Sequence, residues 1–374
     1  MSENVPEALV VQILLLLPHR TLVRLCSVSK AWNSLITSHS FISSHLQRSL
    51  SNPTPHSLLF IRYSIYTTNK PLWHYAFWSS TDPFPFNRFL KLEPPYQIPH
   101  RCSFCFVQSL HGIFCLVEKS LGFDAIDNDI TLWNPSIWRY IRLKVPSVKH
   151  DALGFGFDSK NNDFKVIIRS FNPDEVKLYS LNEGTWKVLD VSYLQGLGLL
   201  KFSNTRCFLN GSVHWITYKA NTCPNKNILM FNVEEERFKN MELPPELVKA
   251  KLSNLHVSVI EGYLTVLKYH DIHDWDDECD IWMMKEYGVT ESWTKNVTIK
   301  FPKGVSQLFG PSTSAKVLLL LQENAAERKD GDFISLDSFN QIQEMMEVGI
   351  QGYKISAWDY RQSLVLLDKE KQVK

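Results

Sequence analysis

The densest group of side chains that could bind a metal lies in "YHDIHDWDDECD", Tyr269 to Asp280. Five of them have the right types to ligate a divalent cation: His270, His273, Asp274, Asp276 and Asp277. The spacing lacks the turn glycine and the terminal glutamate of a calcium-binding loop. We therefore interpret the segment as a solvated loop between strands. A metal site in a propeller-fold enzyme is the alternative.

Other patterns that could carry chemistry are weak. Cys102 and Cys105 form a CxxC pair, but no second pair follows. The surrounding "RCSFCFV" has the pattern of a strand, which places residues three apart on opposite faces. Core thiols in a reducing compartment are the favoured interpretation. "LGFGFD" (Leu153 to Asp158) has two glycines, but no helix follows that could bind phosphate. GxSxG, HExxH, P-loop and GxGxxG motifs are absent from the sequence.

Length and charge set the class of protein. The chain has 374 residues, a formal net charge of +1 and 21% charged residues. This length allows two or more domains. The balanced charge does not indicate binding to nucleic acid or to an anionic membrane. Aromatic residues are in excess at 12%, including 11 Trp.

The chain begins with an apolar run, "EALVVQILLLLPHRTLVRLCSVSKAWNSLI". Glu3 and Glu7 stand where a signal peptide has Lys or Arg, and no small-residue cleavage site follows. The aliphatic core, Leu9 to Leu17, has nine residues, whereas a membrane span needs roughly 20. We therefore expect a soluble intracellular protein.

The same run predicts helices. Asn4 and Glu7 have capping-box spacing, Pro6 suits the first turn, and Pro18 ends the helix. A second helix is expected from Thr21, a third over residues 30–37, and a fourth capped by Ser38 or Ser40. A turn-rich linker, residues 49–57, follows. The first helix is apolar on all sides, so a domain this small cannot cover it alone. A partner, or the rest of the chain, must cover part of it.

After the linker the sequence repeats. Short alternating segments recur, each ending in a polar turn before a second strand that opens with a large apolar residue. These residues are 48 to 55 positions apart: Phe89, Trp138, Trp186, Phe238, Trp293 and Ile342. A period near 50 with about four strands per unit is typical of a kelch-like β-propeller, here of roughly six blades. We interpret the recurring residues as filling the joints between blades.

The N-terminal segment resembles an F-box in its plant form. The resemblance rests on these positions: Pro6, Leu9, Ile13, Leu17, Pro18, Leu22, Arg24, Val28, Lys30, Trp32, Leu35, Ile36, Ser40 and Phe41. Val5-Pro6 replaces the usual opening Leu-Pro, and Ser29 stands where Cys is frequent. The rest of the chain resembles the F-box-associated, kelch-like domain of the large plant F-box family, which includes members of the pollen self-incompatibility locus. "LWNPSIWRYIRL" and "LGFGFDSKNNDFKVI" carry this second resemblance.

The resemblance implies an α+β multidomain fold: an F-box of three or four helices over residues 1–48, the linker 49–57, and an all-β propeller-like domain over 58–374. It implies a substrate-recognition subunit that binds a Skp-type adaptor, and through it a cullin–RING ligase, in the cytoplasm or the nucleus. The propeller would bind a target protein for ubiquitination. No catalytic residue, cofactor or metal is implied. The adaptor surface would be formed or supported by Pro6, Leu9, Ile13, Leu17, Pro18, Leu22, Val28 and Trp32.

Two alternatives stay open besides the adaptor role. One is the propeller-fold enzyme with a metal at residues 270–280. The other is a module that binds glycans or another small ligand, with helices that only dimerise. Specificity in propellers comes from loops. The candidate loops for binding a target are residues 270–280, 218–226 and 322–332.

Overall fold

A computed structural model gives the structure of the chain. It describes the following residues, and the structural statements below concern these alone: 6–51, 58–67, 70–79, 90–97, 102–120, 127–145, 150–170, 175–190, 200–219, 226–270, 278–300, 305–309, 318–322, 331–337, 341–350 and 355–369. The chain divides into two compact units. The first comprises Met1–Leu58, Leu92–Val145 and Tyr360–Lys374, and the second comprises Leu59–Lys91 and Pro146–Asp359.

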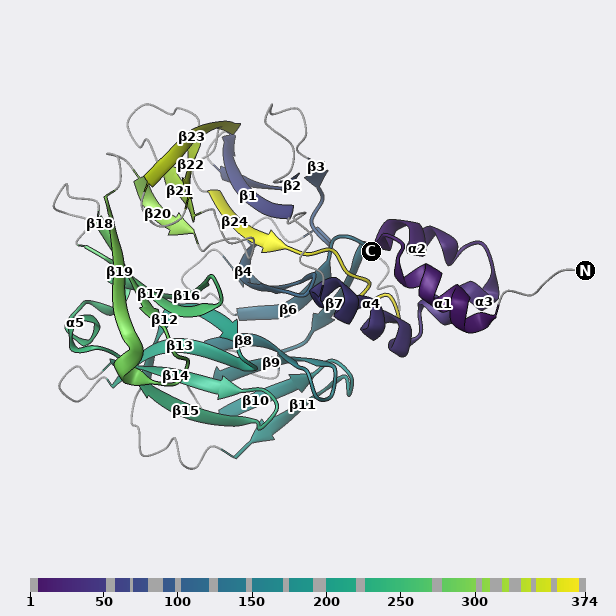
Figure 1. The fold of residues 1–374 in the computed structure, drawn as a ribbon, viewed down its shortest axis with the longest axis horizontal. Helices are drawn as coiled ribbons and strands as arrows, with labels where there is room; N and C mark the ends of the chain where they lie inside the picture. Colours follow the sequence, from purple (N-terminus) through teal and green to yellow (C-terminus); the bar gives the residue numbers. More distant parts are fainter. Residues whose placement is uncertain are drawn as a thin grey trace, which may run out of the picture. The chain divides into compact units, whose positions relative to one another are not determined.

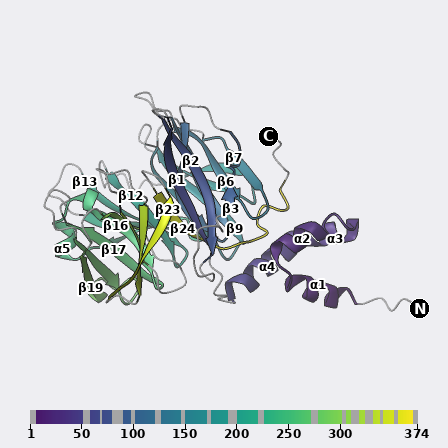
Figure 2. The ribbon, with the colours of Figure 1, turned by 90° about the horizontal axis from the view of Figure 1, so that it is seen from above.

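Helices come first along the chain (Figure 1). They are α1 (Glu7–Leu15), α2 (His19–Leu25), α3 (Lys30–Ile36) and α4 (His39–Ser51). α4 packs against α1 and α3, and α2 packs against α3 (Figure 2). Six apolar side chains, each at most 7% exposed, form their core: Leu14, Leu22, Ile36, Phe41, Ile42 and Leu46. No described helix is both long and apolar enough to cross a membrane.

Proline sets the first helix boundaries differently from the prediction. Pro6 occupies the N-cap of α1 without a side-chain hydrogen bond, so the predicted Asn4 cap is wrong, and Asn4 lies outside the described residues. α1 ends at Leu15, before Pro18. Pro18 is itself the N-cap of α2, with extended backbone at φ −60° and ψ 147°. α2 therefore begins two residues before the predicted Thr21, because proline has the φ that precedes a helix without strain.

Serine side chains cap the N-termini of the next two helices. The Trp32 backbone N–H donates to Ser29 Oγ (3.1 Å) at α3, and the Phe41 N–H donates to Ser38 Oγ (3.3 Å) at α4. These bonds satisfy amides that have no partner within the helix. α4 continues to Ser51, so the first three residues of the predicted linker 49–57 are helical. Residues 52–57 lie outside the described part of the chain.

The strands form six four-stranded sheets in the described residues. The sheet ordered β24–β1–β2–β3 contains β1 (Leu58–Thr67), β2 (Lys70–Ser79), β3 (Leu90–Leu92) and β24 (Ile355–Tyr360). The next three are antiparallel: β4 (Cys102–Leu110), β5 (Ile113–Ser120), β6 (Asp127–Asn134) and β7 (Arg139–Leu143); β8 (His150–Asp158), β9 (Asp163–Ser170), β10 (Glu175–Ser180) and β11 (Thr185–Leu189); β12 (Leu200–Leu209), β13 (Ser212–Lys219), β14 (Lys226–Asn232) and β15 (Arg237–Glu242).

Two further antiparallel sheets complete the set. They contain β16 (Leu255–Ile260), β17 (Tyr263–Tyr269), β18 (Glu278–Met284) and β19 (Trp293–Lys300); β20 (Val305–Phe309), β21 (Leu318–Gln322), β22 (Gly331–Asp337) and β23 (Gln341–Ile350). A short helix, α5 (Pro245–Val248), follows β15. The prediction of a small helical segment followed by about six four-stranded units is confirmed. The sequence did not predict that β24, near the C-terminus, would join β1 in one sheet.

The large residues predicted to fill joints between sheets differ widely in burial. Trp293 is 7% exposed and lies in a core shared by β12–β15 and β16–β19. Phe238 packs on the core shared by β8–β11 and β12–β15, and Trp186 is half-buried. The interpretation is wrong for Trp138, which is 51% exposed in the turn before β7 with a φ of 55°. That backbone conformation interrupts the strand alternation. Two side chains lie outside the described part: Phe89 and Ile342.

Candidate functional site

The exposed apolar face of α1 is the candidate binding surface. Leu9, Ile13 and Leu16 are 48%, 55% and 62% exposed, and their spacing places them along one side of the helix. Leu14 is the only buried residue of α1. The remaining helices therefore cover one side of an apolar helix and leave the other in water. A row of large aliphatic side chains on a surface marks an interaction site.

The eight predicted adaptor residues fall into three groups by exposure. Five are exposed: Pro6, Leu9, Ile13, Pro18 and Val28. Leu17 and Trp32 are half-buried, so each presents part of its side chain. Leu22 is fully buried at 0% exposure and can only support the surface from within. Sequence reasoning missed Leu16, although its spacing from Leu9 and Ile13 was the available signal.

Two histidines lie in the helical core behind this surface. His19 at the start of α2 is 6% exposed, and burial, then Arg20 and His45, lower its pKa to about 4. Burial also lowers the pKa of His45, whose Nε2 lies 3.3 Å from the Leu17 carbonyl oxygen. Both rings are therefore neutral near pH 7. The fold beneath the surface depends on their staying neutral.

The "GFGFD" motif serves packing between two sheets. A Cβ on Gly154 would lie 2.5 Å from Cζ2 of Trp215, and one on Gly156 would lie 2.6 Å from Cγ1 of Val233. Trp215 Nε1 also donates to the Leu153 carbonyl (3.1 Å). Glycine is needed at both positions because neither leaves room for a Cβ between β8 and the sheet β12–β15. Packing between the sheets thus accounts for both glycines.

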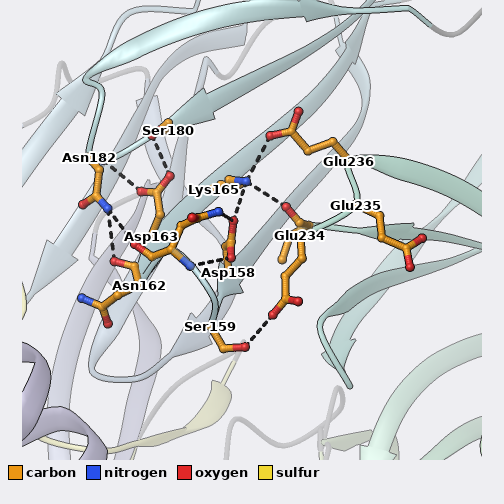
Figure 3. A network of polar contacts seen from close by, with 12 residues as sticks. Asp158, Ser159, Asn162, Asp163, Lys165, Ser180, Asn182, Glu234, Glu235 and Glu236 are labelled. Atoms are coloured by element: carbon orange, nitrogen blue, oxygen red, sulfur yellow. Dashed lines mark hydrogen bonds and ion pairs between the residues drawn. The ribbon is translucent and has the colours of Figure 1, made fainter.

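Asp158, the last residue of this motif, joins later residues in a polar network between the same two sheets (Figure 3). Lys165 Nζ lies 2.8 Å from Asp158 Oδ2 and 3.1 Å from Glu236 Oε1, and it donates to the Val233 carbonyl (2.9 Å). Lys187 Nζ pairs with Glu236 Oε2 at 2.7 Å. Residues 159–162 form the turn between β8 and β9. The charges are paired with one another, which is the arrangement of a structural joint.

Only one of the five candidate metal ligands, His270, lies within the described residues. His270 is described, but its Nε2 lies 3.0 Å from Asp280 Oδ2. Asp280 Oδ1 also lies 2.7 Å from Lys295 Nζ. The other four candidate ligands lie outside the described residues: His273, Asp274, Asp276 and Asp277. Within the described ranges, no three His, Cys, Asp or Glu side chains gather as metal ligands.

In the parts that the structure describes, the CxxC pair and the edges of the candidate loops show no further site. Cys102 and Cys105 lie on β4 as expected, and Cys105 is a half-buried free thiol. Most of each candidate binding loop lies outside the described chain: residues 271–277, 220–225 and 323–330.

Comparison with known proteins agrees with both halves of the chain. A family model described as the F-box domain matches residues 3–44, and one described as the F-box associated beta propeller domain matches residues 102–366. The F-box protein CPR1 of Arabidopsis thaliana is 25% identical over 340 residues, which cover 81% of this chain and 74% of CPR1. An F-box/kelch-repeat protein of the same plant is 24% identical over 334 residues, covering 86% of this chain and 85% of the relative.

Among solved structures, a hypothetical selenium-binding protein from Sulfolobus tokodaii has a TM-score of 0.45 and 8% identity, covering 83% of this chain and 96% of that one. At that TM-score the likeness supports no conclusion. The matched family models cover most of the sequence, and the relatives that align along most of their length are plant F-box proteins. The chain therefore belongs to the F-box protein family whose members carry an F-box associated β-propeller domain.

Proposed function

We propose that the chain is the substrate-recognition subunit of a Skp–cullin–F-box ubiquitin ligase, acting in the cytoplasm or the nucleus. The F-box helices, residues 1–48, bind a Skp-type adaptor, and the propeller domain, residues 58–374, binds the protein to be ubiquitinated. Ubiquitin transfer is carried out by other subunits. This chain then needs no catalytic residue of its own.

One observation carries the adaptor role: α1 leaves Leu9, Ile13 and Leu16 exposed on one side. A partner that covers the exposed half of these side chains removes apolar surface from water. Apolar burial is the main favourable term in association. The other helices already cover Leu14 on the opposite side. The surface is therefore available without unfolding of the helical domain.

Charge substitutions on this face test the proposal directly. Ile13→Glu and Leu16→Glu should each weaken binding of a purified Skp-type adaptor, because a carboxylate would be buried against an apolar partner. A large anchor residue contributes about 2 kcal/mol or more, so each variant should lose about 30-fold in affinity. Gln47→Glu, at an exposed position of α4 rather than on the α1 face, is the control and should bind normally.

Calorimetry or surface plasmon resonance gives the affinities, and the unfolding midpoint checks that the helices remain folded. Unchanged adaptor binding in both aliphatic variants would place the contact elsewhere. The target side is tested by affinity purification with the proteasome inhibited. A protein that accumulates on the full chain, but not on residues 1–51 alone, is the candidate substrate of the propeller.

A further inference from the structure

The residues after β24, 361–369, form neither helix nor strand, yet residues 363–367 are all buried. Tyr360, Ser363, Leu364 and Leu366 are each at most 1% exposed. Leu366 has a φ of 77°, which is rare for a residue with a side chain. We name residues 360–369 the C-terminal segment. It belongs to the same compact unit as the F-box helices and the sheet β4–β7.

The "WNPS" motif at the end of β6 binds the C-terminal segment. Asn134 Nδ2 donates to the carbonyls of Ser363 (3.1 Å) and Val365 (2.8 Å). The Tyr360 hydroxyl donates to Asn134 Oδ1 (2.9 Å), and its ring stacks on Phe114 with centroids 5.1 Å apart. Several buried hydrogen bonds thus fix the backbone of this segment on the sheet. Unpaired, the same buried groups would be strongly unfavourable.

Gly112 lets the segment approach this closely. A Cβ at Gly112 would lie 2.6 Å from the carbonyl oxygen of Arg361, and the φ of 85° there is itself suited to glycine. Arg361 therefore has a fixed backbone, held between the anchored Tyr360 and Ser363. Its side chain starts from a defined point on the sheet β4–β7.

From that point Arg361 reaches the F-box. Its Nη1 donates to the carbonyl of Ser49 at 2.8 Å, in the last turn of α4. Carbonyls in a last turn have no partner within the helix, and a cation there interacts favourably with the helix dipole. α4 in turn packs against α1, the helix with the exposed apolar face. The contact thus connects the sheet to the helix that supports the candidate adaptor surface.

We propose that Arg361 is a positioning residue: through the C-terminal segment it fixes the F-box helices relative to the sheet β4–β7. Its consequence for ubiquitination rests on the proposed function, since a bound adaptor would then stand at a set distance from the sheet β4–β7. The fixing itself does not depend on that function. It can be measured on the chain with or without the adaptor.

The experiment measures a distance within the first compact unit. Spin labels are introduced as unnatural amino acids at Ser34 on α3 and at Lys144 after β7, both exposed. Pulsed electron paramagnetic resonance then gives the distribution of distances. The full chain should give one narrow distribution. Arg361→Gln, which removes the charge, should broaden it, and Arg361→Lys, which keeps a charged donor, should restore much of the narrow component.

A second pair of variants separates the segment from general stability. Asn134→Asp keeps the acceptor that binds the turn but removes the donor to the C-terminal segment, so it should also broaden the distribution. Asn232 accepts from the Glu234 amide (3.0 Å) in the equivalent turn after β14. Asn232→Asp makes the same substitution at a half-buried position in that turn and should leave the distribution narrow.

Adaptor affinity is measured for every variant. A broadened distribution with unchanged affinity supports positioning, since the α1 surface is intact. Arg361→Gln with an unchanged distribution overturns the proposal. A loss of adaptor affinity in Arg361→Gln as large as that in Ile13→Glu also overturns it, because the residue would then serve folding of the helices. If the full wild-type chain binds no adaptor, the proposed function fails, while the distances still decide the role of Arg361.

Discussion

Replacing Lys165 by Met should open the joint between the sheets β8–β11 and β12–β15. The side chains of Lys165 and Asp158 are 7% and 0% exposed, and their Nζ and Oδ2 atoms lie 2.8 Å apart. Methionine fills similar space but leaves a buried carboxylate without its cation. Breaking a buried ion pair in this way costs about 3–5 kcal/mol. Asn161 still donates to Asp158 from its backbone and side chain, so we expect the lower end, about 3 kcal/mol.

The pH dependence distinguishes a lost ion pair from lost packing. Burial alone would raise the pKa of Asp158, but hydrogen bonds from Lys165 and Asn161 outweigh it and lower that pKa below the ordinary 3.8. The wild-type carboxylate therefore stabilises the fold above pH 3.8, and this contribution is lost as the pH falls through the folded pKa. Without Lys165 the pKa of Asp158 rises, so protonation at lower pH removes the buried charge. The cost of Lys165→Met should shrink from pH 7 to pH 5.

Urea unfolding followed by tryptophan fluorescence at both pH values measures this cost, and hydrogen exchange of β8 and β9 amides at pH 7 localises it. The double variant Asp158→Asn/Lys165→Met should recover most of the lost stability, because the carboxylate is gone as well. A cost at pH 7 within the ~0.5 kcal/mol typical of surface substitutions would refute the reasoning. So would an equal cost at pH 7 and pH 5.

Two further predictions concern packing and protonation. Gly154→Ala should cost about 1–3 kcal/mol and speed hydrogen exchange in β13, because the added Cβ would lie 2.5 Å from Trp215. The F-box should lose stability as the pH falls from 6.5 toward about 4, since unfolded His19 takes up a proton in a range where the folded ring stays neutral. The slope is at most about 1.4 kcal/mol per pH unit for this residue. His19→Gln should reduce this slope, leaving the part due to His45, whose pKa burial also lowers. The urea midpoint of unfolding, followed by a dye attached at position 44, measures it.

Local patterns predicted the helices and the repeated strands well, because caps, prolines and alternation act over a few residues. The joint residues show the limit of such reasoning. Trp138 and Trp293 hold equivalent places in the repeat, yet one is 51% exposed and the other 7%. A turn conformation at Trp138 makes the difference, and nothing in the spacing marks it.

The C-terminal segment was not predicted for a different reason. "QSLVLL" reads as a short apolar run without a partner, and its partner Asn134 lies more than two hundred residues earlier. The candidate adaptor surface was intermediate: the resemblance supplied seven residues that are at least partly exposed, but also Leu22, which is fully buried. The exposure of each side chain depends on how α1 packs against α4, which the sequence pattern alone does not determine.

The F-box has few means of stabilising itself, and this explains why two contacts outside it matter. Its described helices share six buried apolar side chains and two neutral histidines, of which His19 is buried and His45 half-buried, a small core for four helices. An adaptor that binds the folded α1 face adds stability only as its concentration exceeds the dissociation constant. The Arg361 contact to α4 lies within the chain and is present at every concentration. An adaptor on the α1 face would make no contact with α4. Arg361 contacts α4 and leaves the α1 face exposed. In the free chain the helices therefore have both their own core and the Arg361 contact, while the apolar face of α1 is exposed.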